Sequence, residues 1–172
     1  EISFKYKRHY FTLKTRINSL MWNEEDGVYY DLDKQEEQIR VKTIATFWPL
    51  LAEIPNEAKA EKLIDHLKNP ETFGTEHPFP TLAADEPMFE KGGMGFRGSV
   101  YPPFTFMVIK ALEKYNQYEF ARSSSIRHLY YIIETLHPDG KDKGNVWEAY
   151  APRSEGPAKW QGKEGFPRPR FL

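Results

Sequence analysis

Apolar side chains recur at helical spacing along much of the chain. The first stripe, at i, i+3, i+7 and i+10, consists of Tyr10, Leu13, Ile17 and Leu20. It predicts a helix over residues 8–20. The same periodicity predicts further helices over residues 57–68, 103–115 and 118–136. A short apolar run over residues 46–54 favours a buried helix before Pro55. The pattern therefore predicts an all-α chain.

Two details add to this picture. Residues 28–32 are typical of a short strand, and the alternation over residues 39–43 predicts its hairpin partner. In the last predicted helix, an apolar stripe is expected to face the core. That stripe consists of Ile126, Leu129, Tyr130, Ile133 and Leu136.

Residues 69–102 and 138–170 are rich in Pro and Gly and are expected to be loops. Loops of about 30 residues inside a compact domain are usually functional. In the first loop, glycines around Arg97 allow the backbone to approach a ligand closely, and the guanidinium can donate a forked pair of hydrogen bonds. The alternative is a flexible surface loop with a solvated Arg97.

Composition narrows the function classes. The 172 residues suit one domain, and the net charge of −1 without a basic block speaks against a nucleic-acid partner. The chain has no apolar run of about 18 residues, so no membrane partner is expected. With no Cys and five scattered His, neither a metal site nor another cofactor is expected. Aromatic residues make up 15%, which suits a core or a sugar-binding cleft.

Glu148 is the candidate carboxylate in the second loop. It lies between Trp147 and Tyr150, and aromatic neighbours can both hold a sugar and shift a carboxyl pKa by partial desolvation. The alternative is a surface acid beside two aromatic residues that cap the core.

Three segments together resemble the family 63 glycoside hydrolases, with their α-glucosidase, trehalase-like and mannosylglycerate hydrolase-like catalytic domains. The segments are Leu20–Asp31, Gly92–Leu112 and Trp147–Pro152. Phe96 and Tyr101 stand where the family usually has Trp.

The resemblance implies part of an (α/α)6 barrel with a small β-hairpin. It also implies an inverting hydrolase of α-glycosidic bonds, with an α-glucoside-like substrate and Glu148 as general base. Substrate-binding residues would be Arg97, Gly98, Phe96, Tyr101, Trp147 and Tyr150. The family's general acid lies in a Gly-Trp-Asp segment, which residues 1–172 lack. Residues 1–172 are therefore expected to be the C-terminal portion of the catalytic domain, inactive alone, with the rest of that domain as partner.

Two other hypotheses remain open. The chain could be a non-catalytic helical domain that binds carbohydrate or protein, because Phe96 and Tyr101 replace Trp. It could also be an epimerase or lyase on the same type of barrel. Such enzymes usually use His residues in the cleft, and the loops here contain few His.

Overall fold

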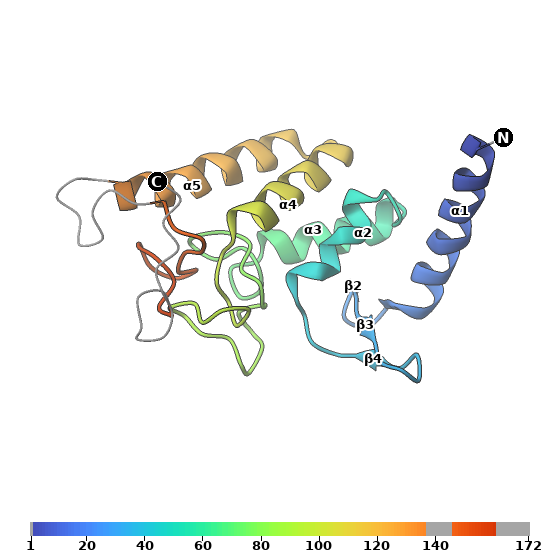
Figure 1. The fold of residues 1–172 in the computed structure, drawn as a ribbon, viewed down its shortest axis with the longest axis horizontal. Coiled ribbons are helices and arrows are strands. Elements are labelled where there is room, and N and C mark those ends of the chain that lie inside the picture. The colour runs from blue at the N-terminus through green and yellow to red at the C-terminus, as the bar shows by residue number, and fades with distance from the viewer. Residues whose placement is uncertain (1, 137–145, 161–172) are drawn as a thin grey trace.

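The structure is a computed structural model that describes residues 2–136 and 146–160, which are mainly helical (Figure 1). The helical elements are α1 (Ile2–Leu20), the 3-10 helix η1 (Ile44–Phe47), α2 (Trp48–Leu51), α3 (Glu57–Lys68), α4 (Pro102–Lys114) and α5 (Tyr118–Leu136). The predicted bounds of α3 and α5 are confirmed. The first helix begins at Ile2 instead of residue 8, and the run over 46–54 is divided between η1 and α2.

The strands differ from the predicted hairpin. They are β1 (Trp22–Asn23), β2 (Val28–Tyr29), β3 (Asp31–Leu32) and β4 (Gln38–Ile39). The antiparallel pairs are β1 with β2 and β3 with β4, so the expected strand over 28–32 serves two hairpins. The division has a local cause, because Tyr30 donates its backbone N–H to the Met21 carbonyl (2.8 Å) and draws the chain back toward α1.

The main core lies among η1, α2, α3 and α4, and the β1–β2 hairpin closes one side of it. Phe47 and Phe73 meet edge to face at its centre, with ring centroids 4.8 Å apart. Burial of apolar side chains of this size contributes about 1.5–3 kcal/mol each. Asn56 caps α3 as its sequence position predicts, since its side chain accepts a hydrogen bond from the backbone N–H of Lys59 (3.0 Å).

The prediction of the buried face of α5 was wrong. Ile126, Leu129, Tyr130 and Ile133 are 49–59% exposed. The buried side chains of this helix are instead Ala121, Ser124, His128 and Thr135. Small and polar side chains on this face let α5 pack closely against α4 and the neighbouring loop, and that leaves the bulkier apolar residues outside.

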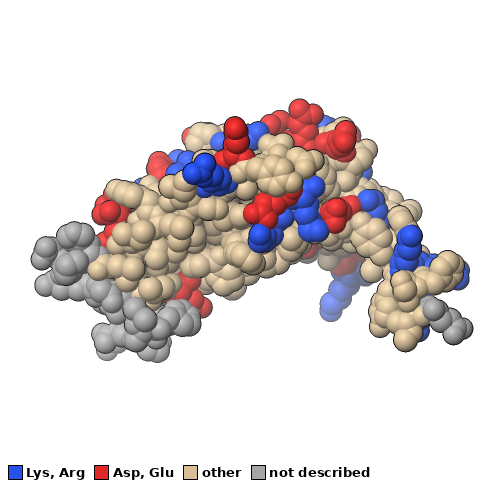
Figure 2. Space-filling model, turned by 90° about the horizontal axis from the view of Figure 1, so that it is seen from above, with Lys and Arg blue, Asp and Glu red and all other residues tan. Residues whose placement is uncertain are grey.

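Exposed apolar side chains are therefore a property of both outer helices. None of the α1 residues is buried, and its exposed members include Phe4 and Phe11. Figure 2 views the molecule from the side on which α5 lies, and residues other than Lys, Arg, Asp and Glu cover much of that face. In the described parts of the chain, no helix combines the length and apolarity needed to cross a membrane.

The two predicted loops come together at one end of the molecule. Residues 69–101 and 146–160 lie side by side below α4 and α5 (Figure 1), and an isolated β-bridge between Val100 and Tyr150 links them. No helix or strand occurs in residues 69–101, as expected. The loop predicted over 138–170 is described only over residues 146–160, which also form no helix or strand.

Candidate functional site

Backbone hydrogen bonds join the glycine-rich segment to the segment that carries Glu148. Val100 and Tyr150 exchange both of their backbone hydrogen bonds, each 2.9 Å long. Nearby, Lys159 donates its backbone N–H to the Gly92 carbonyl (2.7 Å). Segments far apart in the sequence are thereby held in a fixed register, which gives the side chains near these bonds defined places.

Glu148 is half-buried between the buried residues Trp147 and Ala149. Its carboxylate lies close enough to Tyr101 to act on that ring: burial raises the pKa of the Tyr101 hydroxyl, and the nearby charge of Glu148 raises it further. Tyr101 therefore keeps its hydroxyl proton around neutral pH and can act as a hydrogen-bond donor.

Phe96 and Tyr101 form an aromatic surface next to this carboxylate. Their rings are stacked, with centroids 5.6 Å apart and planes 19° from parallel. The Phe96 side chain is 70% exposed, whereas Tyr101 is half-buried at the start of α4. An exposed flat ring backed by a second ring can cover the apolar face of a sugar.

Arg97 and Gly98 lie between these rings in the sequence, in a tight turn. Arg97 forms an ion pair with Glu90 (3.3 Å) and is partly exposed. Gly98 has φ of +101°, and a Cβ there would come within 2.7 Å of the Phe89 ring. Only glycine fits such a position without strain, so Gly98 shapes the turn that presents Arg97. The expectation that Arg97 and Glu148 face the same mouth stays a prediction.

Trp147 and Tyr150 are more deeply placed than a sugar-binding surface requires. Their side chains are 1% and 0% exposed, and they form a small second core with Val100. The Tyr150 phenol oxygen accepts a hydrogen bond from the backbone N–H of Trp147 (3.0 Å), which closes the segment around Glu148. Both rings thus support the segment from inside, and their direct contact with a sugar stays a prediction.

A pair of buried histidines beneath this segment was not predicted from the sequence. His77 Nε2 and His128 Nδ1 are 2.6 Å apart, and the rings are 0% and 7% exposed. His77 stacks on Tyr131, with centroids 4.6 Å apart, and also contacts the Tyr150 ring. The two histidines are 51 positions apart, so no local spacing could pair them. The one available signal was that His128 shares a helical face with Ala121, Ser124 and Thr135.

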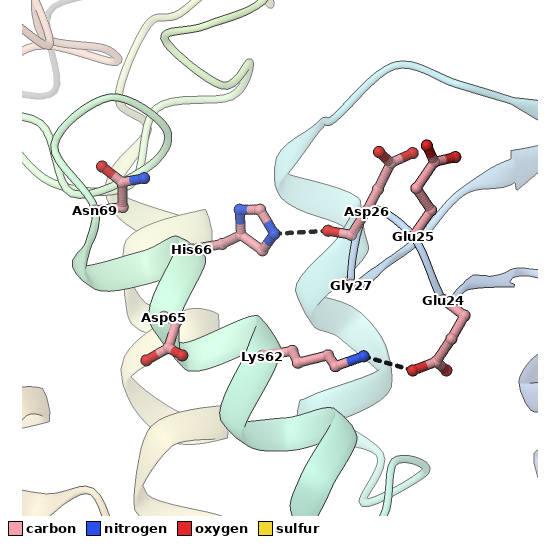
Figure 3. A pocket seen from close by; sticks show the side chains of 8 residues that line it. All are labelled: Glu24, Glu25, Asp26, Gly27, Lys62, Asp65, His66 and Asn69. Atoms are coloured by element: carbon pink, nitrogen blue, oxygen red, sulfur yellow. Dashed lines mark hydrogen bonds and ion pairs between the residues drawn. The ribbon is translucent and has the colours of Figure 1, made fainter.

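The segment Leu20–Asp31, which also resembles the family, lines a separate hollow of about 380 Å³ between the β1–β2 turn and α3 (Figure 3). Its charged side chains are largely satisfied within the protein. Lys62 pairs with Glu24, and His66 Nε2 lies 2.8 Å from the Asp26 carbonyl. For Asp26, burial works to raise the carboxyl pKa, but the hydrogen bonds from Arg40 and Tyr30 outweigh burial and lower it. These contacts stabilise the β1–β2 turn, so the residues around the hollow are better explained by a structural role than by a catalytic one.

Metal-ligating groups do not gather in either place. In residues 2–136 and 146–160, no three His, Cys, Asp or Glu side chains lie where they could hold one ion. The chemistry that this arrangement supports is acid–base chemistry at Glu148 next to aromatic and hydrogen-bonding groups.

Comparison with known proteins gives this site a context. The sequence model of the family described as the mannosylglycerate hydrolase MGH1-like glycoside hydrolase domain matches residues 3–167. An uncharacterized protein of Borreliella burgdorferi is 52% identical over 157 residues, which make up 91% of this chain and 33% of that protein.

Solved structures agree with this result. The GH63 mannosylglycerate hydrolase from Thermus thermophilus in complex with Tris matches with a TM-score of 0.71 and 26% identity, over 89% of this chain and 34% of that one. Other structures of that enzyme hold glucose, or Tris with D-glycerate. Neutral trehalase from Saccharomyces cerevisiae gives a TM-score of 0.73 at 18% identity, over 91% of this chain and 28% of that one. The chain thus spans about a third of these proteins and has the fold of a segment of their (α/α)6 barrel.

Proposed function

Because the chain belongs to the mannosylglycerate hydrolase MGH1-like glycoside hydrolase family, we propose that Glu148 is the general base of an inverting hydrolase that cleaves α-glycosidic bonds. One observation carries the proposal. Glu148 is the half-buried carboxylate of a segment locked by backbone hydrogen bonds to the glycine-rich loop, next to Tyr101 and the exposed Phe96 ring.

In this mechanism, Glu148 takes a proton from a water molecule that attacks the anomeric carbon. A second carboxylic acid on the opposite face protonates the leaving oxygen. The two carboxyl groups of an inverting pair stand about 6.5–9.5 Å apart, which leaves room for the water. The proposed acid lies outside residues 1–172.

The substrate would be held by the groups that surround the base. The stacked Phe96 and Tyr101 rings offer an apolar face to a pyranose ring. Arg97, which is partly exposed beside Gly98, would offer hydrogen bonds to hydroxyl groups or to a carboxylate. We propose an α-glucoside-like substrate, and the glucose and D-glycerate held by the Thermus enzyme make glycosides of small hydroxy acids the first to test.

We also propose that residues 1–172 act as the C-terminal portion of a longer catalytic domain and are inactive alone. Two observations support this. The chain spans about a third of its relatives, and α1 and α5 carry exposed apolar side chains such as Phe4 and Ile133. Exposed apolar patches usually mark an interface. The proposed partner is the remainder of the same domain.

The decisive experiment replaces Glu148 by Gln in the full-length polypeptide. The change preserves shape and removes the proton acceptor, so kcat should fall about 10²–10⁴-fold while substrate binding changes little. Glu155→Gln is the matched control, because Glu155 is an exposed carboxylate of the same segment. The product anomer, followed by NMR, should be inverted in the unmodified enzyme.

A carbohydrate-binding role without catalysis is the second candidate, and the exposed Phe96 ring favours it. Under that hypothesis, the full-length polypeptide binds glycosides but does not hydrolyse them. The wild type and the Glu148→Gln variant would then both show no turnover. Wild-type kcat in the Glu148→Gln variant would rule out the catalytic proposal.

A further inference from the structure

The buried histidine pair links three parts of the chain at one point. His128 comes from α5, and His77 comes from the loop over residues 69–101. His77 also donates its backbone N–H to the Pro152 carbonyl (3.0 Å), and its own carbonyl accepts a hydrogen bond from the Thr75 hydroxyl (2.6 Å). The backbone of His77 is thus held on both sides, and its bond to Pro152 ties it to the segment that carries Glu148.

The contact between the rings sets a condition on their protonation. An N···N separation of 2.6 Å requires that one ring donates an N–H and the other accepts it with a lone pair. Two imidazolium ions have no such lone pair and cannot form this bond. Burial, and for His77 also the positive charges that His128 and Arg127 can carry, lowers the pKa of both rings, that of His128 to about 4.

From the pair, a short series of contacts reaches the carboxylate. The His77 ring contacts the Tyr150 ring, with centroids 5.4 Å apart. The Tyr150 hydroxyl accepts the backbone N–H of Trp147, and the Tyr150 backbone pairs with Val100. Glu148 lies between Trp147 and Tyr150 in the sequence. Any shift of the Tyr150 ring therefore moves the segment on which Glu148 stands.

The geometry points to a positioning role for this pair: the hydrogen-bonded rings of His77 and His128 hold the segment of Glu148 in the pose needed for proton abstraction. The inference rests on the proposed function of Glu148. Neither histidine touches the substrate in this scheme, so both act through Tyr150 and Pro152.

The charged surroundings of the pair are consistent with a neutral resting state. From α5, Arg127 and Tyr131 face His77, and Tyr150 faces it from the other segment. Glu76 precedes His77 and is engaged by Arg153 (3.3 Å). A proton added to the His77 ring would thus be opposed by the charge of Arg127, while the adjacent carboxylate is already paired.

The test compares two kinds of substitution in the full-length polypeptide. His77→Leu and His128→Leu remove the hydrogen bond. His77→Gln and His128→Asn put an amide group near the position of the lost ring nitrogen, and an amide both donates and accepts but does not titrate. We expect the leucine variants to lose about 10- to 100-fold in kcat with little change in KM, because small misplacement of a reacting group has such effects. We expect the amide variants to recover most of the loss, and His128→Asn to keep the hydrogen-exchange protection of residues 146–151 at lower pH than the wild type.

A readout independent of turnover separates this inference from the proposed function. Hydrogen exchange of the backbone amides in residues 146–151 should be faster in the leucine variants than in the wild type, and should return to the wild-type rate in the amide variants. Unchanged exchange together with wild-type kcat in the leucine variants would overturn the positioning role. If the leucine variants do not fold, the amide variants decide: protection of residues 146–151 that falls on acidification to pH 4 as far in His128→Asn as in the wild type overturns the inference, and a smaller fall supports it. Failure of the proposed function is a different result: kcat of the Glu148→Gln variant would then equal that of the wild type.

Discussion

The helical core and the cluster of loops around Glu148 are held together by different kinds of contact. In the core, apolar side chains such as Phe47 and Leu63 are fully buried between helices whose backbones satisfy their own hydrogen bonds. In the loop cluster, the backbones of two segments bond to each other, and the buried side chains are mainly polar or aromatic, with His77 and Tyr150 at the centre. Loss of side-chain volume in the core should therefore lower the stability of the protein most. In the loop cluster, stability should depend on pH and on backbone strain.

The largest effect is expected in the helical core. Phe47→Ala removes a fully buried ring that meets Phe73 edge to face, so the free energy of unfolding should fall by about 3–5 kcal/mol. Urea denaturation followed by circular dichroism measures this. Met88→Ala is the control, because Met88 is 60% exposed and should change stability little. Equal effects of the two substitutions would contradict the placement of the core.

The second effect belongs to the loop cluster and depends on pH. The pKa of His128 is lowered from about 6.5 to about 4 by burial, so between these values the unfolded chain binds the proton more readily than the folded one. Stability should therefore fall as the pH drops from about 6.5 to 4, by about 3 kcal/mol from His128 alone. His77, whose pKa is also lowered, acts in the same direction.

Denaturation midpoints measured between pH 7 and pH 4 check this slope. His128→Asn should flatten it, since the amide does not titrate, whereas Phe47→Ala should lower the whole curve without changing its shape. A wild-type slope in His128→Asn would mean that other groups govern the acid sensitivity of the protein.

The same contrast explains what the sequence could predict. Helix α3 was predicted at its observed bounds because a clear apolar stripe coincides with the Asn56 cap and with the Asn69-Pro70 stop. Periodicity alone identified α5 but chose the wrong face, because this helix has apolar residues on more than one side and buries its small and polar ones. A hydrophobic pattern does not reveal which face finds a close-packed neighbour.

For the candidate site, the roles of the residues chosen from the sequence stay predictions. Arg97 and Glu148 were selected by their glycine and aromatic neighbours and by the resemblance to a family, and the bridge between Val100 and Tyr150 brings their segments together. The histidine pair was not predicted, because contacts between residues as distant as 77 and 128 depend on the tertiary fold. The hairpin was predicted in part: β3 and β4 pair close to the expected ranges, but the pairing of Val28 and Tyr29 with β1 was missed, since the Tyr30 bond to Met21 leaves no trace in strand periodicity.

A third, smaller effect tests backbone strain in the glycine-rich segment. Gly98→Ala should destabilise the protein by about 2 kcal/mol, because φ is +101° and the new Cβ would press on the Phe89 ring. Gly95→Ala is a matched control: φ is also positive, +56°, but the Cβ would meet nothing within 4 Å. Its cost should be about 1 kcal/mol. Thermal melts of both variants measure the difference, and equal values would remove the argument for close packing at Gly98.

The smallest effect on stability is expected at the ion pair between Arg97 and Glu90. Both side chains are 42% exposed, and exposed pairs contribute at most about 1 kcal/mol, so Glu90→Gln should leave the free energy of unfolding nearly unchanged. Glu113→Gln breaks a comparably exposed pair with Lys110 on α4 and is the matched control. The difference should appear in substrate binding instead. If Arg97 binds the glycoside, freeing its guanidinium from Glu90 should change KM, while Glu113→Gln should not. Equal KM values in the two variants would mean that the ion pair of Arg97 has no part in substrate binding. A large loss of stability in Glu90→Gln would mean that side-chain charge stabilises this loop more than its backbone hydrogen bonds do.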